Sequence, residues 1–572
     1  MSAPIISFKD FSFQYHSQSE PTLRHINLDI YPGEKVLIAG PSGCGKSTLG
    51  RCLNGLIPQS FPGKLTGSVT VAGTEMRASS IFDRSLAVGT VLQDPDSQFV
   101  GLTVAEDVAF SLENDQQPQA AMKAATAKWA RTLDLTELLS HRPQELSGGQ
   151  KQRVAMAGVL IDNSKILLFD EPLASLDPAS GKASMALVEQ LTRSDNLTVI
   201  IIEHRIEDVL QQPIDRLVVM QDGQIVANDR PETILRQSLL AQLGLREPLY
   251  LSALKFAGVP LDSCRHLDRL PELTVPNLTA QLQRWTNGVQ LKQPVRHDEA
   301  LLTIEHLQFG YDPDRPIIND LSVTLNRGEM ISLVGQNGTG KSTLNNLITG
   351  FLTPQAGTMR FNGHPLAGQS VKERADQIGY ILQDPNQMLS KTMIFDEVAA
   401  GLVLRGVDEV TIEQRVNRVL KVCGLYEFRH WPTAALSFGQ KKRVTIAAIL
   451  VMQPAMLILD EPTAGQDLKH YTEMMRFLTQ LNREQQITIM LITHDMHLML
   501  EYTDRTIVLG NGGILMDAAP ADVLTNATII EQASLAKTSL YQLAEAHHID
   551  PTEFVAKFVQ TDREARKCNT NS

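Results

Sequence analysis

The sequence predicts an α/β protein made of two tandem P-loop domains, each followed by a small, mainly helical tail. Two observations support this prediction. A glycine-rich loop of the form G-x-x-x-x-G-K-[ST] occurs at residues 40–47 and again at 335–342. An apolar strand precedes each loop and a helical pattern follows it, which is the context that a phosphate-binding loop requires.

A second series of motifs follows each loop in the same order, which indicates a tandem duplication. Matching residues of this series lie 290 positions apart, whereas the loop lysines lie 295 apart. The matching pairs are Ser147 and Ser437, Glu171 and Glu461, His204 and His494, and the loop lysines Lys46 and Lys341. Duplication of the whole set predicts two cooperating nucleotide sites.

Individual elements follow from the apolar patterns. Alternation predicts half-buried strands, short apolar runs predict buried parallel strands, and helical periodicity predicts a helix between the motif clusters. The expected strands are 5–13, 23–30, 35–39, 166–169 and 198–202, and the expected helix is 120–139. The expected parts are a first domain at 3–230, its tail at 231–269, a linker at 270–299, a second domain at 300–519 and its tail at 520–572.

Length and composition narrow the class of protein. A chain of 572 residues is longer than one hydrophobic core usually serves. No apolar run approaches the roughly 18 residues of a membrane span, and the first residues lack a signal-peptide pattern. The net charge of −12 argues against a nucleic-acid backbone as the main partner. Five widely spaced cysteines predict a reducing compartment without a disulfide framework.

The glycine-rich loops contain the residue types that bind a triphosphate. Their glycines let backbone N–H groups approach phosphate oxygens without a Cβ in the way. Each loop lysine adds a positive charge, and the helix N-terminus adds the positive end of its dipole. We expect ATP to bind to Gly40, Pro41, Ser42, Gly43, Cys44, Gly45, Lys46, Ser47 and Thr48, and to Gly335, Gln336, Asn337, Gly338, Thr339, Gly340, Lys341, Ser342 and Thr343.

Polar residues end two of the apolar strands in each copy. We expect the aspartates, with the loop serines, to hold Mg²⁺: Asp170 with Ser47, and Asp460 with Ser342. The adjacent glutamates would orient the attacking water, and the histidines would touch the γ-phosphate: Glu171, Glu461, His204 and His494. One Asp-Glu pair or one histidine alone is more often an ordinary polar strand end. The ordered set, present twice, favours ATP hydrolysis.

The motifs resemble those of the ABC ATPase family, and Leu-Ser-Gly-Gly-Gln at 146–150 separates that family from other P-loop proteins. The resemblance covers residues 5 to about 230 and 302 to about 520, and implies a mixed sheet core with a helical subdomain in each domain. It implies that Tyr15 and Tyr311 stack on adenine, and that Gln93 and Gln383 sense Mg²⁺. It also implies nucleotide contacts for Ser147, Gly149, Gln150, Ser437, Gly439 and Gln440.

By the family's architecture the two halves pack head to tail as an internal pseudo-dimer, so each signature completes the other half's ATP site. The segments 174–177 and 464–467 match the loop that links the sites. Phe438 replaces the usual second-signature glycine. We expect the ATP site that contains this second signature to keep nucleotide binding. The sequence does not predict that this site turns over as fast as the other.

The segments after the glutamines, Gln-Asp-Pro at 93–95 and at 383–385, resemble the energy-coupling-factor (ECF) group of importers. That resemblance implies an integral membrane transport subunit, a separate substrate-binding membrane component, no nucleic-acid partner, and a place at the cytoplasmic face of the cell membrane. A surface loop with a proline turn is the ordinary alternative. The fused halves with Leu-Ser-Phe-Gly-Gln resemble ATPases linked with hydroxymethylpyrimidine or thiamine uptake; the group also takes up transition-metal ions.

Two other classes of protein share parts of this pattern. A soluble tandem ABC ATPase that acts on ribosomes would carry a long charged linker, which this chain lacks. A DNA-repair ATPase would need zinc cysteines or a long inserted coiled coil, and the sequence has neither. Transport therefore remains the favoured interpretation.

Two smaller hypotheses concern single positions. Cys44 lies in the first loop near a helix N-terminus, where a thiolate is favoured, so one hypothesis is that alkylation blocks that site and ATP protects it. A small residue that fills the loop is the ordinary interpretation. The basic runs 151–153 and 441–443 follow the signatures. We expect them to be solvated positions near a helix start.

Overall fold

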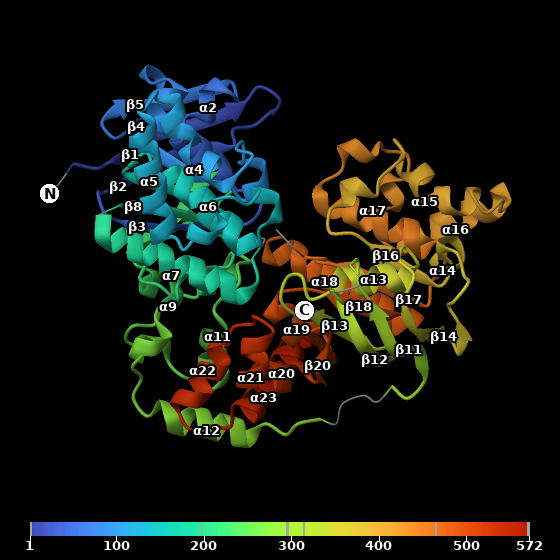
Figure 1. Ribbon diagram of the computed structural model, residues 1–572. Coiled ribbons are helices and arrows are strands. Elements are labelled where there is room, and N and C mark those ends of the chain that lie inside the picture. The colour runs from blue at the N-terminus through green and yellow to red at the C-terminus, as the bar shows by residue number, and fades with distance from the viewer. Residues whose placement is uncertain are drawn as a thin grey trace. The chain divides into compact units, whose positions relative to one another are not determined.

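The computed structural model describes residues 3–174, 176–195, 197–292, 297–312, 315–463 and 466–568. The chain divides into two compact units, Met1–Arg284 with Asp467–Lys469 and Trp285–Gln466 with His470–Ser572. Both units contain one antiparallel and one mainly parallel sheet, each with helices around them (Figure 1). This confirms the expected α/β fold with a mixed sheet core in each copy.

In the first unit the antiparallel sheet has the order β2-β1-β4-β5 and the second sheet the order β10-β9-β3-β8-β7-β6. The strands expected at 23–30, 35–39 and 198–202 have the predicted bounds. The strands are β1 (Ile6–Tyr15), β2 (Leu23–Ile30), β3 (Lys35–Ala39), β4 (Gly63–Val71), β5 (Thr74–Glu75), β6 (Val88–Val91), β7 (Ile166–Asp170), β8 (Thr198–Ile202), β9 (Arg216–Gln221) and β10 (Gln224–Asp229).

Helices of the first unit surround these sheets and form its tail. They are α1 (Lys46–Leu53), α2 (Leu56–Gln59), α3 (Ile81–Ser85), α4 (Val104–Asn114), α5 (Gln119–Thr132), α6 (Gly148–Leu160), α7 (Pro178–Asp195), α8 (Ile206–Val209), α9 (Pro231–Arg236), α10 (Leu239–Gln242), α11 (Leu249–Phe256) and α12 (Leu278–Gly288). The helix expected over 120–139 was too long. It ends at Thr132 because Asp134 adopts a positive φ of 53°, which stops helical hydrogen bonding before a short 3₁₀ turn at Thr136–Leu138.

The second unit repeats this order, with sheets β12-β11-β14-β15 and β16-β17-β18-β13-β19-β20. Its strands are β11 (Ala300–Phe309), β12 (Ile318–Asn326), β13 (Met330–Val334), β14 (Ala356–Phe361), β15 (His364–Pro365), β16 (Ile378–Ile381), β17 (Met456–Asp460), β18 (Thr488–Ile492), β19 (Arg505–Gly510) and β20 (Gly513–Ala518). Its helices are α13 (Lys341–Thr349), α14 (Val371–Ala375), α15 (Ile394–Val403), α16 (Glu409–Val422), α17 (Phe438–Leu450), α18 (Leu468–Gln485), α19 (Met496–Tyr502), α20 (Pro520–Thr525), α21 (Ala527–Gln532), α22 (Ser539–Ala546) and α23 (Pro551–Cys568).

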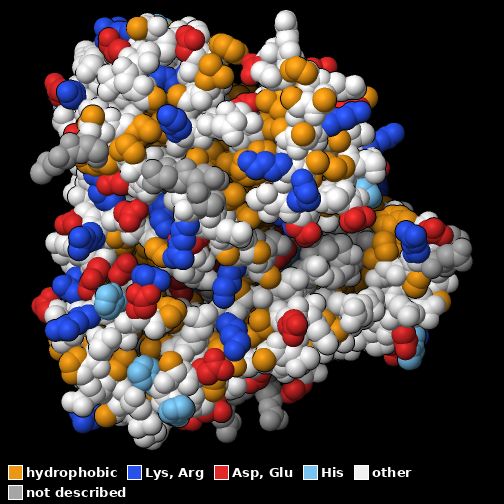
Figure 2. All heavy atoms as spheres, turned by 60° about the vertical axis from the view of Figure 1, so that its left-hand side comes forward, with side chains coloured by type: hydrophobic (Ala, Val, Ile, Leu, Met, Phe, Trp, Pro, Cys, Tyr) orange, Lys and Arg blue, Asp and Glu red, His pale blue; other side chains and the backbone are white. Residues whose placement is uncertain are grey.

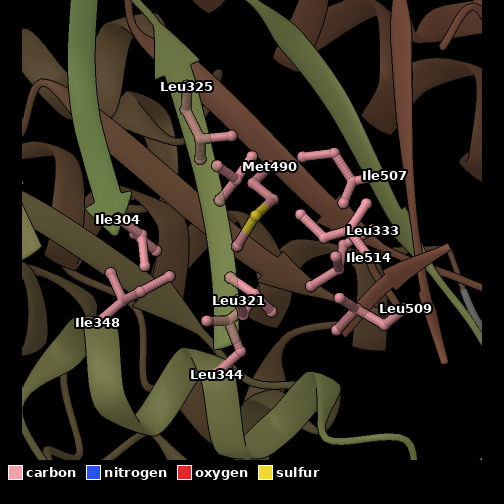
Figure 3. Close-up of a pocket in the computed structure, with 11 residues that line it drawn as sticks. Ile304, Leu321, Leu325, Leu333, Leu344, Ile348, Met490, Ile507, Leu509 and Ile514 are labelled. Carbon is pink, nitrogen blue, oxygen red and sulfur yellow. The ribbon is translucent and has the colours of Figure 1, made fainter. Parts of the chain in front are cut away.

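One hydrophobic core joins the two sheets of each unit. In the first unit Phe8 and Phe13 of β1 share it with Ile38 of β3 and Leu49 of α1, and all four side chains are buried. In the matching core of the second unit, aliphatic side chains and Met490 surround a cavity of about 10 Å³ (Figure 3). This volume holds at most one water molecule, and its walls are wholly apolar. The cavity is therefore a packing gap in the core.

Each antiparallel sheet contains one contact between an aspartate and a histidine, and the two residues occur in opposite order in the two units. Asp10 of β1 lies 2.7 Å from His25 of β2, whereas in the second unit His306 of β11 lies 2.6 Å from Asp320 of β12. All four residues adopt a positive φ between 47° and 56° at register shifts of their sheets. Asp and His tolerate this conformation better than most residues, so either order of the pair is compatible with the turn of the strands.

The C-terminal tail of the second unit packs beside the sheets of that unit. Helices α20, α21, α22 and α23 lie together, next to α19 and β20 (Figure 1). On α23, Arg563 donates to the backbone carbonyls of Glu501 at 3.0 Å and Thr503 at 2.8 Å, at the C-terminal end of α19. Trp285, with which the second unit begins, lies in the C-terminal part of α12, and its ring meets that of Phe554 of α23 edge to face, with 5.4 Å between the ring centroids.

A buried arginine caps the helix that follows the second glycine-rich loop. Arg374 is 5% exposed and donates to the carbonyls of Leu347 at 2.7 Å and Ile348 at 3.1 Å in the last turn of α13. Arg84, at the matching position, donates only to the hydroxyl of Ser79 at 2.7 Å among the hydrogen bonds of the described residues.

We therefore predict that Arg374→Met destabilises the second unit by about 2–3 kcal/mol, because helix carbonyls lose buried partners. Arg84→Met should cost less, about 1 kcal/mol. Hydrogen exchange of the α13 amides measures the local effect, and it should speed up in Arg374→Met alone. Equal protection of α13 in both variants would contradict this capping role.

Candidate functional site

The polar residues singled out by their motifs lie at one edge of each six-stranded sheet. In the first unit β7 pairs in parallel with β8, and Asp170 lies opposite Ile202 at the strand ends. In the second unit Asp460 lies opposite Ile492 in the same register. Strand β3, which leads into the loop, pairs with the other side of β8. Because parallel strands end at the same edge, the loop, the carboxylates and the histidine of each unit converge there.

Each loop lysine lies inside its own loop. The Lys46 Nζ atom donates to the carbonyl oxygens of Gly40 at 2.8 Å and Pro41 at 2.9 Å. Lys341 makes the matching bonds in the second unit, at 2.7 and 3.0 Å. Charged phosphate oxygens form stronger hydrogen bonds with an ammonium group than neutral carbonyls do, so a triphosphate can recruit this charge.

The residue before each lysine must be glycine. Gly45 and Gly340 begin α1 and α13 with φ angles of 105° and 99°. A Cβ on Gly45 would also lie 2.8 Å from the side chain of Leu23. This left-handed turn lets the first N–H groups of each helix face the loop, where an anion binds.

The two aspartates are half-buried carboxylates at the ends of their strands. Burial raises the pKa of Asp170, and the neighbouring Glu171 raises it further. Its Oδ1 atom has no hydrogen-bond partner among the described residues, while the Ser47 hydroxyl hydrogen-bonds to the same carboxylate. Burial also raises the pKa of Asp460, which accepts a hydrogen bond from the Tyr380 hydroxyl at 3.3 Å. Hydroxyl and carboxylate oxygens are ligands that Mg²⁺ accepts, so these residues fit that ion.

The glutamates after these aspartates have strained backbones. Glu171 and Glu461 adopt φ angles of 51° and 41°, a region that costs a non-glycine residue of order 1–3 kcal/mol. Their backbone N–H groups donate to the carbonyls of Ile202 and Ile492, each at 2.9 Å. The strand that leads to the histidine therefore holds each glutamate in this conformation.

The glutamate and the histidine contact each other differently in the two units. The His204 Nε2 atom lies 3.1 Å from Glu171 Oε1, whereas His494 Nε2 lies 4.0 Å from Glu461 Oε1. Glu461 instead accepts from the backbone N–H of His494 at 2.9 Å and from the Thr493 hydroxyl at 3.3 Å. Burial, followed by the nearby carboxylates, raises the pKa of Glu461 to about 7.

The two signatures are helix caps of the same geometry. Ser147 precedes α6 and Ser437 precedes α17, and each accepts from the backbone N–H of the glutamine three residues later. The side-chain oxygen of that glutamine, Gln150 or Gln440, in turn accepts from the backbone N–H of the serine, at 2.8 and 3.0 Å. The serine-to-glutamine spacing is therefore a capping box. Phe438 occupies the first helical position outside this reciprocal pair and leaves the cap intact.

The two tyrosines occupy different surroundings. The Tyr15 hydroxyl lies 3.1 Å from the Thr48 hydroxyl of the loop and accepts from Arg51 at 3.2 Å. Tyr311 is 64% exposed. Gln93 and Gln383 follow β6 and β16, directly before the 3₁₀ turns Pro95–Ser97 and Pro385–Gln387.

Several expected positions lie outside the part of the chain that the structure describes. In the segments expected to link the sites, these are residues 175, 464 and 465; in the polar C-terminal end they are residues 569–572.

Two expectations are corrected. Cys44 is 4% exposed, and burial raises the pKa of its thiol, so the expected thiolate character is wrong. The basic runs are not solvated at their central positions, since Gln152 and Lys442 are 2% and 1% exposed. Gln152 donates to the carbonyl of Pro172 at 3.0 Å, and Lys442 donates to that of Glu461 at 2.9 Å.

Three further residues lie near the carboxylates without belonging to the motifs of a nucleotide site: Glu203, Tyr380 and Lys442. Burial lowers the pKa of Lys442 to about 8, although the surrounding carboxylates oppose this shift. When the two halves are aligned at the 290-residue offset, the matching residues of the other half are Thr493, Thr90 and Gln152, respectively. That comparison is the signal that could have revealed them.

The described residues place limits on other kinds of site. No group of three or more His, Cys, Asp or Glu side chains within them is arranged to hold a metal ion. None of the helices in these residues combines the length and the apolar character that crossing a membrane requires.

The loop, the strand-end carboxylates, the histidine and the capped signature define each unit as an ABC-type ATPase domain. Comparisons with known proteins agree. A family model described as ABC transporter matches residues 23–174 and 318–464, and one described as ATP-binding cassette cobalt transporter matches 237–309.

Two relatives match nearly the whole chain, and both bear the name of an ABC transporter ATP-binding protein. One from Lactiplantibacillus plantarum is 81% identical and one from Enterococcus faecalis 56% identical; the alignments cover 99% of this chain and 100% of each relative. A solved structure of CbiO1 from Clostridium perfringens, described as part of the ABC transporter complex CbiONQ, is 33% identical over 44% of this chain and 98% of its own, with a TM-score of 0.39. The chain belongs to the family of ABC transporter ATP-binding proteins.

We predict that Glu461→Gln stabilises the nucleotide-free protein increasingly as the pH rises from about 5 to 7. The pKa of Glu461 is about 7 in the fold against an ordinary 4.5, so its bound proton stabilises the fold at low pH. That contribution is lost as the pH rises through 7, and neutral glutamine does not lose it. Thermal unfolding at pH 5, 6, 7 and 8 measures the difference, with exposed Glu75→Gln as the control. A pH-independent difference would contradict the burial of this carboxylate.

Proposed function

We propose that this chain is the ATP-binding and ATP-hydrolysing subunit that energises a membrane importer of the ECF type, at the cytoplasmic face of the cell membrane. The observation that carries this proposal is the presence of a complete set of ATPase residues in each half. The loop lysines Lys46 and Lys341 attract the phosphates. Glu171 and Glu461 take a proton from the attacking water, and each lies beside a histidine that can reach the terminal phosphate.

Mg²⁺ belongs to the same proposal. Ser47 and Asp170 would hold one ion and Ser342 and Asp460 the other. When bound, Mg²⁺ supplies positive charge beside the phosphates. We further propose that the two halves form an internal pseudo-dimer, in which the signature of each half completes the ATP site of the other.

A candidate docking segment for the membrane subunit follows Gln93. Val100 and Leu102 are 63% and 80% exposed, so this short segment presents two large apolar side chains to solvent. The Asp107 carboxylate accepts from the backbone N–H groups of Val100 at 2.8 Å and of Gly101 at 2.9 Å, which fixes the segment.

This segment is also connected to the signature helix. Lys151 of α6 donates to Asp96 at 2.8 Å, directly before the exposed residues. In the second unit Lys441 of α17 donates to Asn386 at 2.9 Å. A partner that moves the segment would therefore move the start of the signature helix, which is the coupling that transport requires.

The cargo is proposed at the level of class. A vitamin or vitamin precursor such as hydroxymethylpyrimidine or thiamine is suggested by the fused halves with the Phe438 signature, and a transition-metal ion by the cobalt-transporter model at 237–309. The matching relatives bear transporter names, which does not favour the ribosome alternative. Acidic and basic side chains are interspersed over the face in Figure 2, and the net charge is −12, so we propose no nucleic-acid partner.

The test of catalysis uses one variant per half. Glu171→Gln and Glu461→Gln should each lower turnover at their own site by about 10²-fold, the usual contribution of a general base, and so lower the rate of the full chain clearly. Steady-state phosphate release measures this, with exposed Glu75→Gln as the matched control. Full activity in either single variant would refute the proposal of two active sites.

The test of partnership uses charge on the docking segment. The double variant Val100→Asp with Leu102→Asp should reduce recovery of a membrane subunit from detergent-solubilised membranes about tenfold, since exposed apolar anchors carry much of such binding. ATP binding should be unchanged. Val226→Asp on β10, where valine is 43% exposed, is the control. Undiminished recovery, or recovery of ribosomes in its place, would refute this part of the proposal.

A further inference from the structure

The two units hold the glutamate and histidine on matching backbones but with different hydrogen bonds. Glu171 and Glu461 share a left-handed conformation and the same 2.9 Å anchor to the neighbouring strand. The contrast between 3.1 Å at His204 and 4.0 Å at His494 must therefore come from nearby side chains. The residue directly before each histidine differs: it is a glutamate in the first unit and a threonine in the second.

In the first unit Glu203 is a buried acceptor with three backbone partners. It is 2% exposed, and its Oε1 atom accepts from the N–H groups of His204 at 2.8 Å and Arg205 at 3.1 Å. Its Oε2 atom accepts from the N–H of Leu173 at 3.2 Å, in the loop that follows Glu171. Arg205 lies next to this carboxyl group and also donates to the carbonyl of Leu173 at 3.0 Å.

In the second unit no carboxylate occupies this position. Thr493 accepts from the N–H of Asp495 at 3.0 Å and donates its own hydroxyl to Glu461. The N–H of His494 has Glu461 as its acceptor at 2.9 Å. The Glu461 carboxyl group, which we propose acts on water, is therefore hydrogen-bonded to the backbone N–H at the end of the strand.

We propose that Glu203 is a positioning residue: by accepting the backbone N–H of His204, it leaves the Glu171 carboxylate to pair with the His204 imidazole. The catalytic pair of the first unit is then assembled before nucleotide binds. In the second unit Glu461 must first leave the N–H of His494. The two ATP sites therefore turn over at different rates, and the site of Glu171 is the faster. This inference rests on the proposed roles of Glu171 and His204.

The test resolves the two halves within the full chain. Photolabelling with 8-azido-ATP measures binding, and vanadate-dependent trapping of the same probe measures turnover; mass spectrometry of the labelled peptides assigns each signal to its half. The variants are Glu203→Thr, which introduces the residue of the second unit, and Glu203→Gln, which keeps an acceptor oxygen. Exposed Glu75→Thr makes the same chemical exchange on β5 and is the matched control.

In Glu203→Thr the trapping rate of the first half should fall about tenfold, because a displaced catalytic group costs at least that much. Binding by that half should change less than about twofold, and the second half should trap as before. Glu203→Gln should retain trapping within about threefold of the parent. An unchanged trapping rate in Glu203→Thr, or an equal loss in Glu203→Gln, would overturn the inference.

The outcome separates this inference from the function on which it rests. If Glu171→Gln leaves trapping in the first half unchanged, the proposed catalytic role of Glu171 fails. If Glu171→Gln abolishes that trapping while Glu203→Thr does not change it, only the positioning role of Glu203 fails. Binding at both halves in every variant shows that the protein remains folded.

Discussion

The parallel register of the central strands is the constraint on which both ATP sites depend. Strand β8 lies between β3 and β7, and β18 lies between β13 and β17, so each histidine strand separates the loop strand from the carboxylate strand. A slip of one residue would turn every side chain of a strand to the opposite face. The apolar residues that bury these strands on both faces therefore also fix which polar residues meet at their ends.

Much of this arrangement could be predicted from the sequence, because strand burial and loop chemistry are local signals. After their first residues, Lys35 and Thr198, the runs 35–39 and 198–202 are apolar, and the strands end where the glycine-rich loop and Glu203 begin. Features that depend on distant packing could not be predicted. The thiol of Cys44 is buried among core residues of the first unit, and nothing in the loop sequence reveals this burial. Likewise the sequence around Lys442 predicts a solvated helix residue, whereas in the fold its ammonium group donates to the backbone carbonyl of Glu461.

The duplication shows which local requirements tolerate exchange. The pair Asp10 and His25 reappears in reversed order as His306 and Asp320, with similar distances and φ angles. The strand turn requires two residues that accept a positive φ, and the order is free. The exchange of Glu203 for Thr493 is of a different kind, since the acceptor of the histidine N–H is a separate carboxyl group, Glu203, in the first unit and Glu461 itself in the second.

Phe438 alone therefore does not account for the asymmetry between the sites. It leaves the signature cap intact, but its ring lies 5.9 Å from the ammonium of Lys442, which donates to the backbone carbonyl of Glu461. The start of α17 is thus connected to the backbone of Glu461 in its own unit. In the first unit neutral Gln152 occupies the matching position. The second unit has the buried Lys442 beside Glu461, while the first has the buried carboxyl group of Glu203 near Glu171, so the titratable neighbours of the two glutamates differ as well as their hydrogen bonds.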